Sequence, residues 1–153
     1  MQITVNNQPG LRLAGKTYKL EDIGQAGKIR KKFLDEFNDV DLGELGSFCG
    51  LRKYNALDGT YDYFLGFETS DKDFIKQRSL EIYETDESLY LEVPVGSEDL
   101  LEEGYRYTYE EFFPNKKYFH SLGPDVEFFQ YDNQKKAIAN VGLYISLMEN
   151  INV

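Results

Sequence analysis

The most unusual chemical feature of the sequence is an acid, Glu127, inside a stretch that otherwise looks like a covered strand. Along residues 124–131 the side chains alternate between the two faces of an extended chain, and both faces carry apolar residues. An unpaired carboxylate in such a place is costly to bury, or else it keeps its proton. Two interpretations stay open. Glu127 is either an ordinary exposed residue of an edge strand, or a carboxylate at the floor of an aromatic pocket, where it would pair with a cationic ligand.

The chain is also rich in the aromatic residues that such a pocket would need. It has 12 tyrosines and 11 phenylalanines but no tryptophan, which makes 15% of its residues aromatic. A tyrosine ring has an apolar body and a polar tip, so it suits both a packed core and the wall of a ligand site. Candidates for the second role are Tyr63 in mid-strand, Tyr105 and Phe112 on one stripe of a helix, and Tyr144, which is either exposed or caps a cavity.

The sequence lacks the residues, or the residue spacing, that other kinds of active site require. The chain has one cysteine, Cys49, and one histidine, His120, without the CxxC or HExxH spacing of zinc sites. No Ser-His-Asp set is indicated, and the glycine-rich phosphate loops are absent from the sequence. We therefore predict no metal and no cofactor, and we expect Cys49 to be a small buried side chain.

The charge balance argues against direct binding to nucleic acid. Lysine and arginine total 17 against 27 aspartates and glutamates, a formal net charge of −10, whereas nucleic-acid binding draws most of its affinity from cationic contacts. The basic cluster of Lys28, Arg30, Lys31 and Lys32 is interpreted as the solvated face of a helix. No apolar run approaches the roughly 18 residues of a membrane span, and residues 1–10 do not resemble a signal peptide. We expect a cytoplasmic protein that binds no membrane.

Two helices are predicted to position the candidate residues. Apolar side chains recur at spacings of three and four in residues 22–38 and again in residues 97–113. Ser97 is a suitable N-cap for the second helix, and Pro114 would stop it. One strand-like run precedes each helix and two follow it; the predicted strands are 11–18, 47–54, 60–68, 88–93, 125–131 and 139–148.

The two sets of elements superpose after a shift of 76 residues, which brings Gly66 onto Gly142. We infer a duplicated strand-helix-strand-strand unit, with pseudo-repeats over about 1–70 and 77–153 within a single domain of residues 1–153. The predicted class is α+β, in which both units share an antiparallel sheet with the two helices on one face. Residues 72–84 join the halves and contain a candidate edge strand at 80–83. The two helices would leave a groove between them.

Several stretches, in order along the chain, resemble a known family. They are Tyr63-Phe64-Leu65-Gly66-Phe67-Glu68, residues 88–93, residues 107–114, and residues 124–129 followed by 141–147. Together they are similar to the GyrI-like small-molecule-binding domain, which is also the effector-binding domain of many AraC- and MerR-type bacterial transcription regulators. The resemblance implies the duplicated fold, and a pocket between the two helices for bulky aromatic, often cationic compounds.

The resemblance also implies which residues contact a ligand. The family's pocket glutamate corresponds to Glu127, the tyrosine of its Tyr-x-x-Gly strand to Tyr63, and the tyrosine on the strand before the second helix to Tyr90. Phe112 stands where the family commonly has tryptophan, and Phe129 where it usually has tyrosine. The expected ligand-binding set is Glu127, Tyr63, Tyr90, Tyr105, Phe112 and Tyr144.

The expected function is the binding of bulky, lipophilic, aromatic and cationic small molecules by a multidrug or effector sensor. Because Met1 already lies near the first strand, we expect a stand-alone form that acts through a partner protein. Two alternatives remain. One is a hydrolase that opens the cyclopropane rings of genotoxic natural products, with Glu127 as general base and a tyrosine as acid. The other is an acidic protein that binds and inhibits gyrase. Binding without catalysis is favoured.

Overall fold

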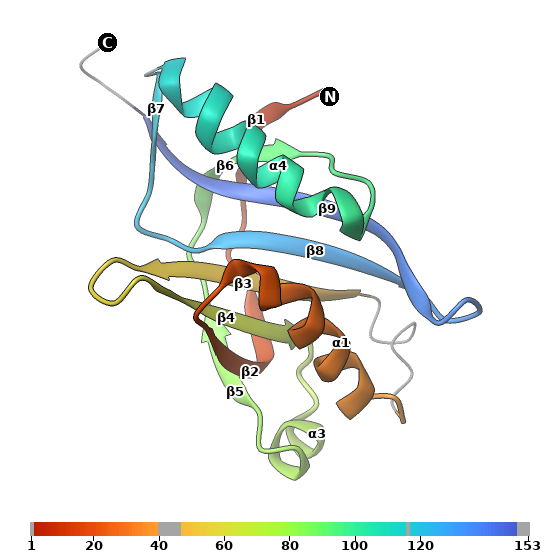
Figure 1. The fold of residues 1–153 in the computed structure, drawn as a ribbon. Helices are drawn as coiled ribbons and strands as arrows, with labels where there is room; N and C mark the ends of the chain where they lie inside the picture. Colours follow the sequence, from red (N-terminus) through yellow and green to blue (C-terminus); the bar gives the residue numbers. More distant parts are fainter. Residues whose placement is uncertain (1, 40–46, 116, 150–153) are drawn as a thin grey trace.

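In the computed structural model, which describes residues 2–39, 47–115 and 117–149, an antiparallel sheet of nine strands carries the helices α1 and α4 on one face (Figure 1). The helices are α1 (Ala26–Glu36), α3 (Lys72–Gln77) and α4 (Leu101–Tyr107). None of them is long and apolar enough to cross a membrane. The strands are β1 (Thr4–Gln8), β2 (Arg12–Leu20), β3 (Ser47–Asn55), β4 (Thr60–Phe67), β5 (Glu81–Glu84), β6 (Ser88–Val93), β7 (Tyr118–His120), β8 (Asp125–Asp132) and β9 (Ala137–Glu149).

The order of the strands confirms the predicted duplication. Across the sheet the order is β1-β6-β9-β8-β3-β4-β2-β5, and β7 pairs with β9 off this path. The units β2-α1-β3-β4 and β6-α4-β8-β9 therefore occupy equivalent positions on the two sides of the centre, where β3 pairs with β8. The 76-residue shift carries the start of β2 at Arg12 onto the start of β6 at Ser88. The α+β class with helices on one face is confirmed.

The outermost strands are exchanged between the two units. β1 pairs with β6, while β5, which matches the predicted edge strand at 80–83, pairs with β2. The chain between β1 and β2 therefore passes from one side of the sheet to the other. There the Thr85 N–H donates to the Leu11 carbonyl at 2.9 Å, and the Leu11 N–H donates to the Thr85 hydroxyl at 2.9 Å. Strand β1 was not predicted, because its sequence TVNNQ has one aliphatic side chain and no alternation.

The sheet separates two apolar clusters because side chains alternate along each strand. The larger cluster lies under the helices, where the Phe33 and Phe67 rings stack at 5.2 Å and the Phe48 and Phe129 rings stack at 4.7 Å between centroids. The smaller cluster lies on the opposite face, here called the back face, and contains Leu13, Cys49, Leu51, Phe64, Tyr90 and Val126. The position of Glu127 on β8 places it on the helix side, with Phe129.

Local signals explain where the two long helices begin and end. The Asp22 side chain accepts a 3.0 Å bond from the Gly24 N–H and starts the turn that leads into α1. Ser97 precedes the first turn before α4, but its side chain makes no capping bond, so that part of the prediction is wrong. α4 continues as a π-helical segment over Thr108–Phe112 and a final turn that contains Pro114. Such π segments are frequent at functional sites.

Besides β1, two other short elements do not follow from the sequence patterns. Helix α3 begins where the Asp71 side chain accepts from the Phe74 N–H at 3.1 Å, and it lies within residues 72–84, which join the two halves. The Phe74 ring lies 6.1 Å from that of Phe37 between centroids, so α3 covers one end of the larger cluster. Strand β7 has three residues. Elements this short carry too few residues to show a period.

Candidate functional site

Glu127 is fully buried at the centre of the sheet, beneath the two helices. It is 0% exposed, and it lies opposite Gly50 of β3 in the pairing of the two central strands. Of the two interpretations left open by the sequence, the exposed edge residue is therefore wrong. A buried carboxylate needs partners, and three side chains supply them.

Two tyrosine hydroxyls donate to the two oxygens of Glu127. Tyr63, on β4, donates to Oε1, and Tyr105, on α4, donates to Oε2. Burial, followed by the charge of Glu127, raises the pKa of Tyr63 well above its ordinary value of 10.0. Burial likewise raises the pKa of Tyr105. Both hydroxyls therefore keep their protons and act as donors.

The third partner is Arg52, which is not among the residues expected to bind a ligand. Its Nη2 lies 3.0 Å from Glu127 Oε2, and its side chain is 5% exposed. The guanidinium lies over the Tyr105 ring at 4.0 Å from the centroid, and over the Tyr63 ring at 5.6 Å. On its outer side it donates to both oxygens of Glu102, on α4, at 2.8 and 3.2 Å. Glu127 is therefore not a lone acid, because a cation of the chain already faces it.

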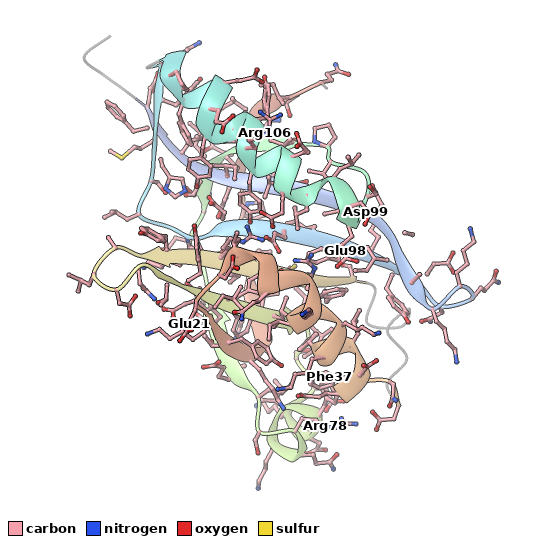
Figure 2. All side chains as sticks on the ribbon, in the orientation of Figure 1. Glu21, Phe37, Arg78, Glu98, Asp99 and Arg106 are labelled. Atoms are coloured by element: carbon pink, nitrogen blue, oxygen red, sulfur yellow. The ribbon has the colours of Figure 1, made fainter. Side chains whose placement is uncertain are left out.

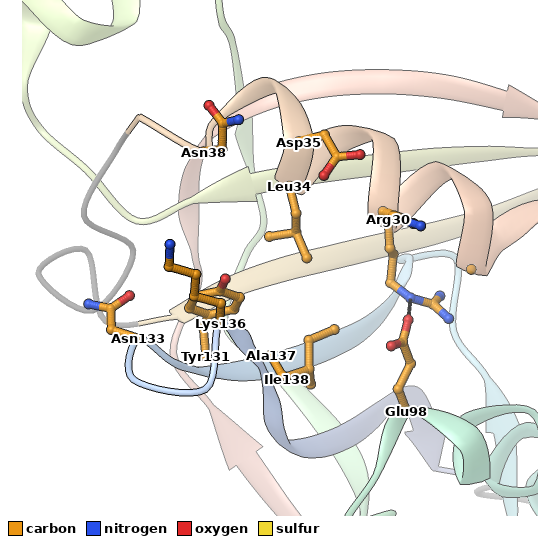
Figure 3. Close-up of a pocket in the computed structure, with 12 residues that line it drawn as sticks. Arg30, Leu34, Asp35, Asn38, Glu98, Tyr131, Asn133, Lys136, Ala137 and Ile138 are labelled. Atoms are coloured by element: carbon orange, nitrogen blue, oxygen red, sulfur yellow. Dashed lines mark hydrogen bonds and ion pairs between the residues drawn. The ribbon is translucent and has the colours of Figure 1, made fainter.

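A second arginine, Arg30 of α1, extends this network. Its Nη1 donates to the Tyr63 hydroxyl at 2.9 Å, and its Nε donates to Glu98 at 2.7 Å. Glu98, labelled in Figure 2, lies in the turn Glu98–Leu100 that leads into α4. The pair, drawn in Figure 3, therefore connects α1 to the start of α4. Arg30 is 5% exposed, which corrects its assignment to a solvated basic face. Its guanidinium lies 5.4 Å from the centroid of the Phe129 ring.

Two cavities open on either side of this network. One, of about 750 Å³, is called the tyrosine cavity; its lining includes Tyr54, Tyr61, Tyr105, Tyr109, Arg52 and Asp125. The other, of about 790 Å³, is called the α1 cavity; its lining includes Arg30, Leu34, Asp35, Glu98, Tyr131 and Ile138 (Figure 3). Glu127 lines neither cavity. Arg52 stands between it and the tyrosine cavity, and Arg30 lies on the side of the α1 cavity.

Glycine at position 50 makes room for the carboxylate. A Cβ there would lie 2.6 Å from Glu127 Oε1 and 2.9 Å from the Tyr63 ring, closer than real contacts allow. We expect Gly50→Ala to lower the free energy of unfolding by about 1–3 kcal/mol, because the network must shift to accept the methyl group. Urea unfolding measures the change. Gly24→Ala is the control, since its Cβ would have 3.5 Å to the nearest atom; equal effects for the two variants would contradict the crowding described here.

An ion pair at the far wall of the tyrosine cavity involves the chain's single histidine. His120 Nε2 lies 2.7 Å from Asp125 Oδ1, and Nδ1 faces the carbonyl of Ser121. The Tyr109 hydroxyl donates to the other oxygen of Asp125 at 2.7 Å. Burial works to lower the pKa of His120, but the bond to Asp125 and its charge outweigh burial and raise the pKa above 6.5. The protonated ring satisfies both acceptors at once.

The raised pKa of His120 predicts a pH-dependent stability. The pair contributes fully below pH 6.5, and its contribution is lost as the pH rises through the folded-state pKa. His120→Gln should therefore destabilise the protein at about pH 5.5 and much less at about pH 9. Urea unfolding of both proteins at the two pH values measures this difference. A difference that stays constant between them would show that His120 is uncharged in the folded protein.

The structure brings together only part of the expected ligand-binding set. Tyr63, Tyr105 and Glu127 meet in one network. Tyr90 and Tyr144 lie on the back face, because they alternate with residues that face the helices, and they line a separate pocket of about 310 Å³ with Phe128. Phe112 lies near the end of the α4 segment, with its ring stacked on that of Tyr118 at 5.9 Å. It lines neither the tyrosine cavity nor the α1 cavity.

A signal for the two missed arginines was present in the sequence. Arg30 falls at helical spacing from Ala26 and Phe33, and Arg52 falls four residues after Phe48 and so on the same face of its strand; each therefore lies on an apolar face. A charged residue on such a face is uncommon unless it is paired. Their partners Glu98 and Glu102 lie 68 and 50 residues away in sequence, which no local pattern indicates.

Comparison with known proteins gives the fold and site their context. SAV2435, solved bound to tetraphenylphosphonium, is 16% identical, covers 97% of this chain and 94% of its own, and has a TM-score of 0.69. An integron cassette protein from the mobile metagenome of Vibrio cholerae is 11% identical, covers 95% of each chain, and has a TM-score of 0.67. The C-terminal domain of EcmrR is 12% identical, covers 97% of this chain and 98% of its own, and has a TM-score of 0.64. At these identities the likeness shows the fold.

The sequence itself decides the family. No curated protein matches it, but the profile of Cass2, the integron-associated effector binding protein, matches residues 7–147. That match spans both repeats and every residue of the network around Glu127. The chain therefore belongs to the Cass2 family of integron-associated effector-binding proteins, within the GyrI-like superfamily.

Proposed function

We propose that this effector-binding chain takes bulky, lipophilic, aromatic cations into the tyrosine cavity, with Glu127 as the buried counter-charge. The observation that carries the proposal is the network itself: a carboxylate with no exposed surface, contacted by two tyrosines and by a cation stacked on one of their rings. That arrangement is how proteins recognise organic cations, through ring faces and a nearby negative charge. SAV2435, which shares the fold, was solved with such a cation.

The lining of the tyrosine cavity suits a large aromatic guest. Rings come from β3, β4, α4 and the π-helical segment that follows α4, and they belong to Tyr54, Tyr61, Tyr105 and Tyr109. The cavity also meets the buried carboxylate of Asp125 and, at its rim, Glu102. Its volume of about 750 Å³ falls within the range of small-molecule sites. Rings supply contact area, and the acids supply the preference for positive charge.

The direct test is calorimetric titration with tetraphenylphosphonium. We expect the wild-type chain to bind it and Glu127→Gln to bind at least about tenfold more weakly, because the substitution removes the charge and keeps the shape. Glu92→Gln is the matched control. It makes the same change in net charge on the back face, where Glu92 accepts from Thr4 at 2.9 Å. Equal affinities of wild type and Glu127→Gln for tetraphenylphosphonium would show that Glu127 is not the counter-charge of the bound cation.

The same geometry favours binding over hydrolysis. A general base needs a free acceptor oxygen within reach of water. Oε1 of Glu127 accepts from Tyr63, and Oε2 accepts from Tyr105 and pairs with Arg52. Tyr63 and Tyr105 keep raised pKa values, which makes them poor proton donors to a leaving group. We therefore expect a cyclopropane compound to be recovered unchanged after incubation with the protein, as measured by mass spectrometry; a product heavier by one water would reinstate the hydrolase.

A further inference from the structure

We propose that the guanidinium of Arg52 occupies the cation position of the site, and that a ligand cation enters by displacing it. The inference rests on the proposed function. It means that the Arg52 side chain competes with the ligand cation for that site. It also names a ligand class, because the position fits a flat, delocalised cation such as an arylguanidinium.

The surroundings of Arg52 are those of a bound organic cation. One face of its guanidinium lies over the Tyr105 ring at 4.0 Å, and its Nη2 lies 3.0 Å from Glu127 Oε2. A second ring, that of Tyr63, lies 5.6 Å away. Two aromatic faces and a carboxylate around one flat cation form the recognition pattern expected for the ligand. In the structure, the chain's own side chain provides that cation.

Arg52 also controls access to Glu127. It lines the tyrosine cavity, whereas Glu127 does not, and the two side chains are in direct contact. A ligand in the cavity therefore meets the Arg52 guanidinium before it meets the carboxylate. If Arg52 stayed in place, its positive charge would repel a cation at the position where the ring faces and the acid attract one. Cation binding at Glu127 consequently requires Arg52 to move.

The buried position of Arg52 leaves one of its hydrogen-bond donors without an acceptor, which makes displacement of the side chain feasible. Among the described residues, its Nε is one of two buried side-chain nitrogen or oxygen atoms without a hydrogen-bond partner. A buried donor without an acceptor destabilises the position that it occupies. Glu102, which already accepts from both terminal nitrogens, is half exposed at the cavity rim. The guanidinium can therefore turn outward toward water and keep this partner, while the inner position becomes free.

Arg30 is the comparison that singles out Arg52. It is buried to the same degree, but its Nε donates to Glu98 and its Nη1 donates to the Tyr63 hydroxyl. It contacts Glu127 only through Tyr63, and among the described residues the α1 cavity beside it is lined by one tyrosine, whereas the tyrosine cavity is lined by four. Arg30 is thus fixed by its bonds and connects α1 to the start of α4, whereas Arg52 occupies the position that we assign to a ligand cation.

Removing the Arg52 side chain tests the proposal. Arg52→Ala should bind phenylguanidinium at least about tenfold more tightly than the wild type, by calorimetric titration. Methylguanidinium, which matches the missing head group, should raise the melting temperature of Arg52→Ala and leave that of the wild type unchanged. Arg12→Ala is the control for net charge, because Arg12 is exposed and paired with Glu84 on β5. Affinity equal to or below that of the wild type, without a rise in melting temperature, would overturn the proposal.

A second measurement needs no variant. In the ¹⁵N-labelled wild-type protein, the Nε–H resonance of Arg52 should shift and exchange faster with water when tetraphenylphosphonium is added, while that of Arg30 stays in place. If the wild type binds tetraphenylphosphonium and the Arg52 resonance does not respond, the displacement is wrong and the proposed function stands. If neither the wild type nor Arg52→Ala binds any of the three cations, the proposed function fails as well.

Discussion

Glu127→Ala is expected to lower the free energy of unfolding by about 3–5 kcal/mol, the cost of breaking a buried ion pair by removing one partner. The substitution leaves the Arg52 guanidinium with its inner face unpaired, and it leaves the Tyr63 and Tyr105 hydroxyls without their acceptor. All three groups are buried, so water replaces the lost partner poorly. Chemical denaturation of the variant and the wild type measures the difference.

The control for this prediction lies at the other end of the same arginine. Glu102 also pairs with Arg52, but its side chain is half exposed. Glu102→Ala should therefore cost within about 1 kcal/mol, as exposed ion pairs do. The prediction is that Glu127→Ala loses much more unfolding free energy than Glu102→Ala. If Glu102→Ala destabilised the chain as strongly as Glu127→Ala, the buried position of Glu127 would not be the source of the effect.

Tyr63→Phe is expected to have the second largest effect, with a loss of about 2–5 kcal/mol. Its hydroxyl accepts from Arg30 and donates to Glu127, so its removal leaves two buried charged groups each short of one bond. A buried group without its partner costs about 1–3 kcal/mol, and charged groups cost more. Tyr105→Phe removes one bond, and Glu127 Oε2 keeps Arg52 as a partner, so its loss should be smaller.

Tyr54→Phe provides the control for hydroxyl removal. Tyr54 is 56% exposed, so the loss of its hydroxyl should change stability by less than about 0.5 kcal/mol. The three variants thus have an expected order, with Tyr63→Phe the most damaging and Tyr54→Phe the least. Thermal or urea unfolding measures it. A Tyr63→Phe variant as stable as Tyr54→Phe would mean that the hydroxyl does not bridge Arg30 and Glu127.

The arrangement of the fold followed from patterns that repeat along the chain. Apolar spacing indicated the two long helices, alternation indicated the central strands, and the 76-residue shift indicated that they form two like units. The same alternation correctly grouped Glu127 with Phe129 and separated both from Val126. These features are set by residues close together in sequence, which is why the sequence reveals them.

The site could be predicted only in part, because its contacts join distant segments. Alternation shows that Tyr144 and Leu143 face opposite ways, but it does not show which face the helices cover. In the structure the helices cover the face that carries Leu143, so Tyr90 and Tyr144 lie on the back face, away from Glu127. Alternation places Arg52 on the apolar face of its strand, but no local pattern indicates that Glu127 is its partner, because β8 comes five strands after β3 along the chain and their register is defined only in the assembled sheet.

The most direct measurement is a crystal structure of the chain with tetraphenylphosphonium. The account predicts the cation in the tyrosine cavity, with a phenyl ring against Tyr105, the phosphonium nearer to Glu127 than to any other acid, and the Arg52 guanidinium turned outward toward Glu102. A cation bound instead in the back-face pocket of Tyr90, Tyr144 and Phe128, with Arg52 still paired to Glu127, would contradict it.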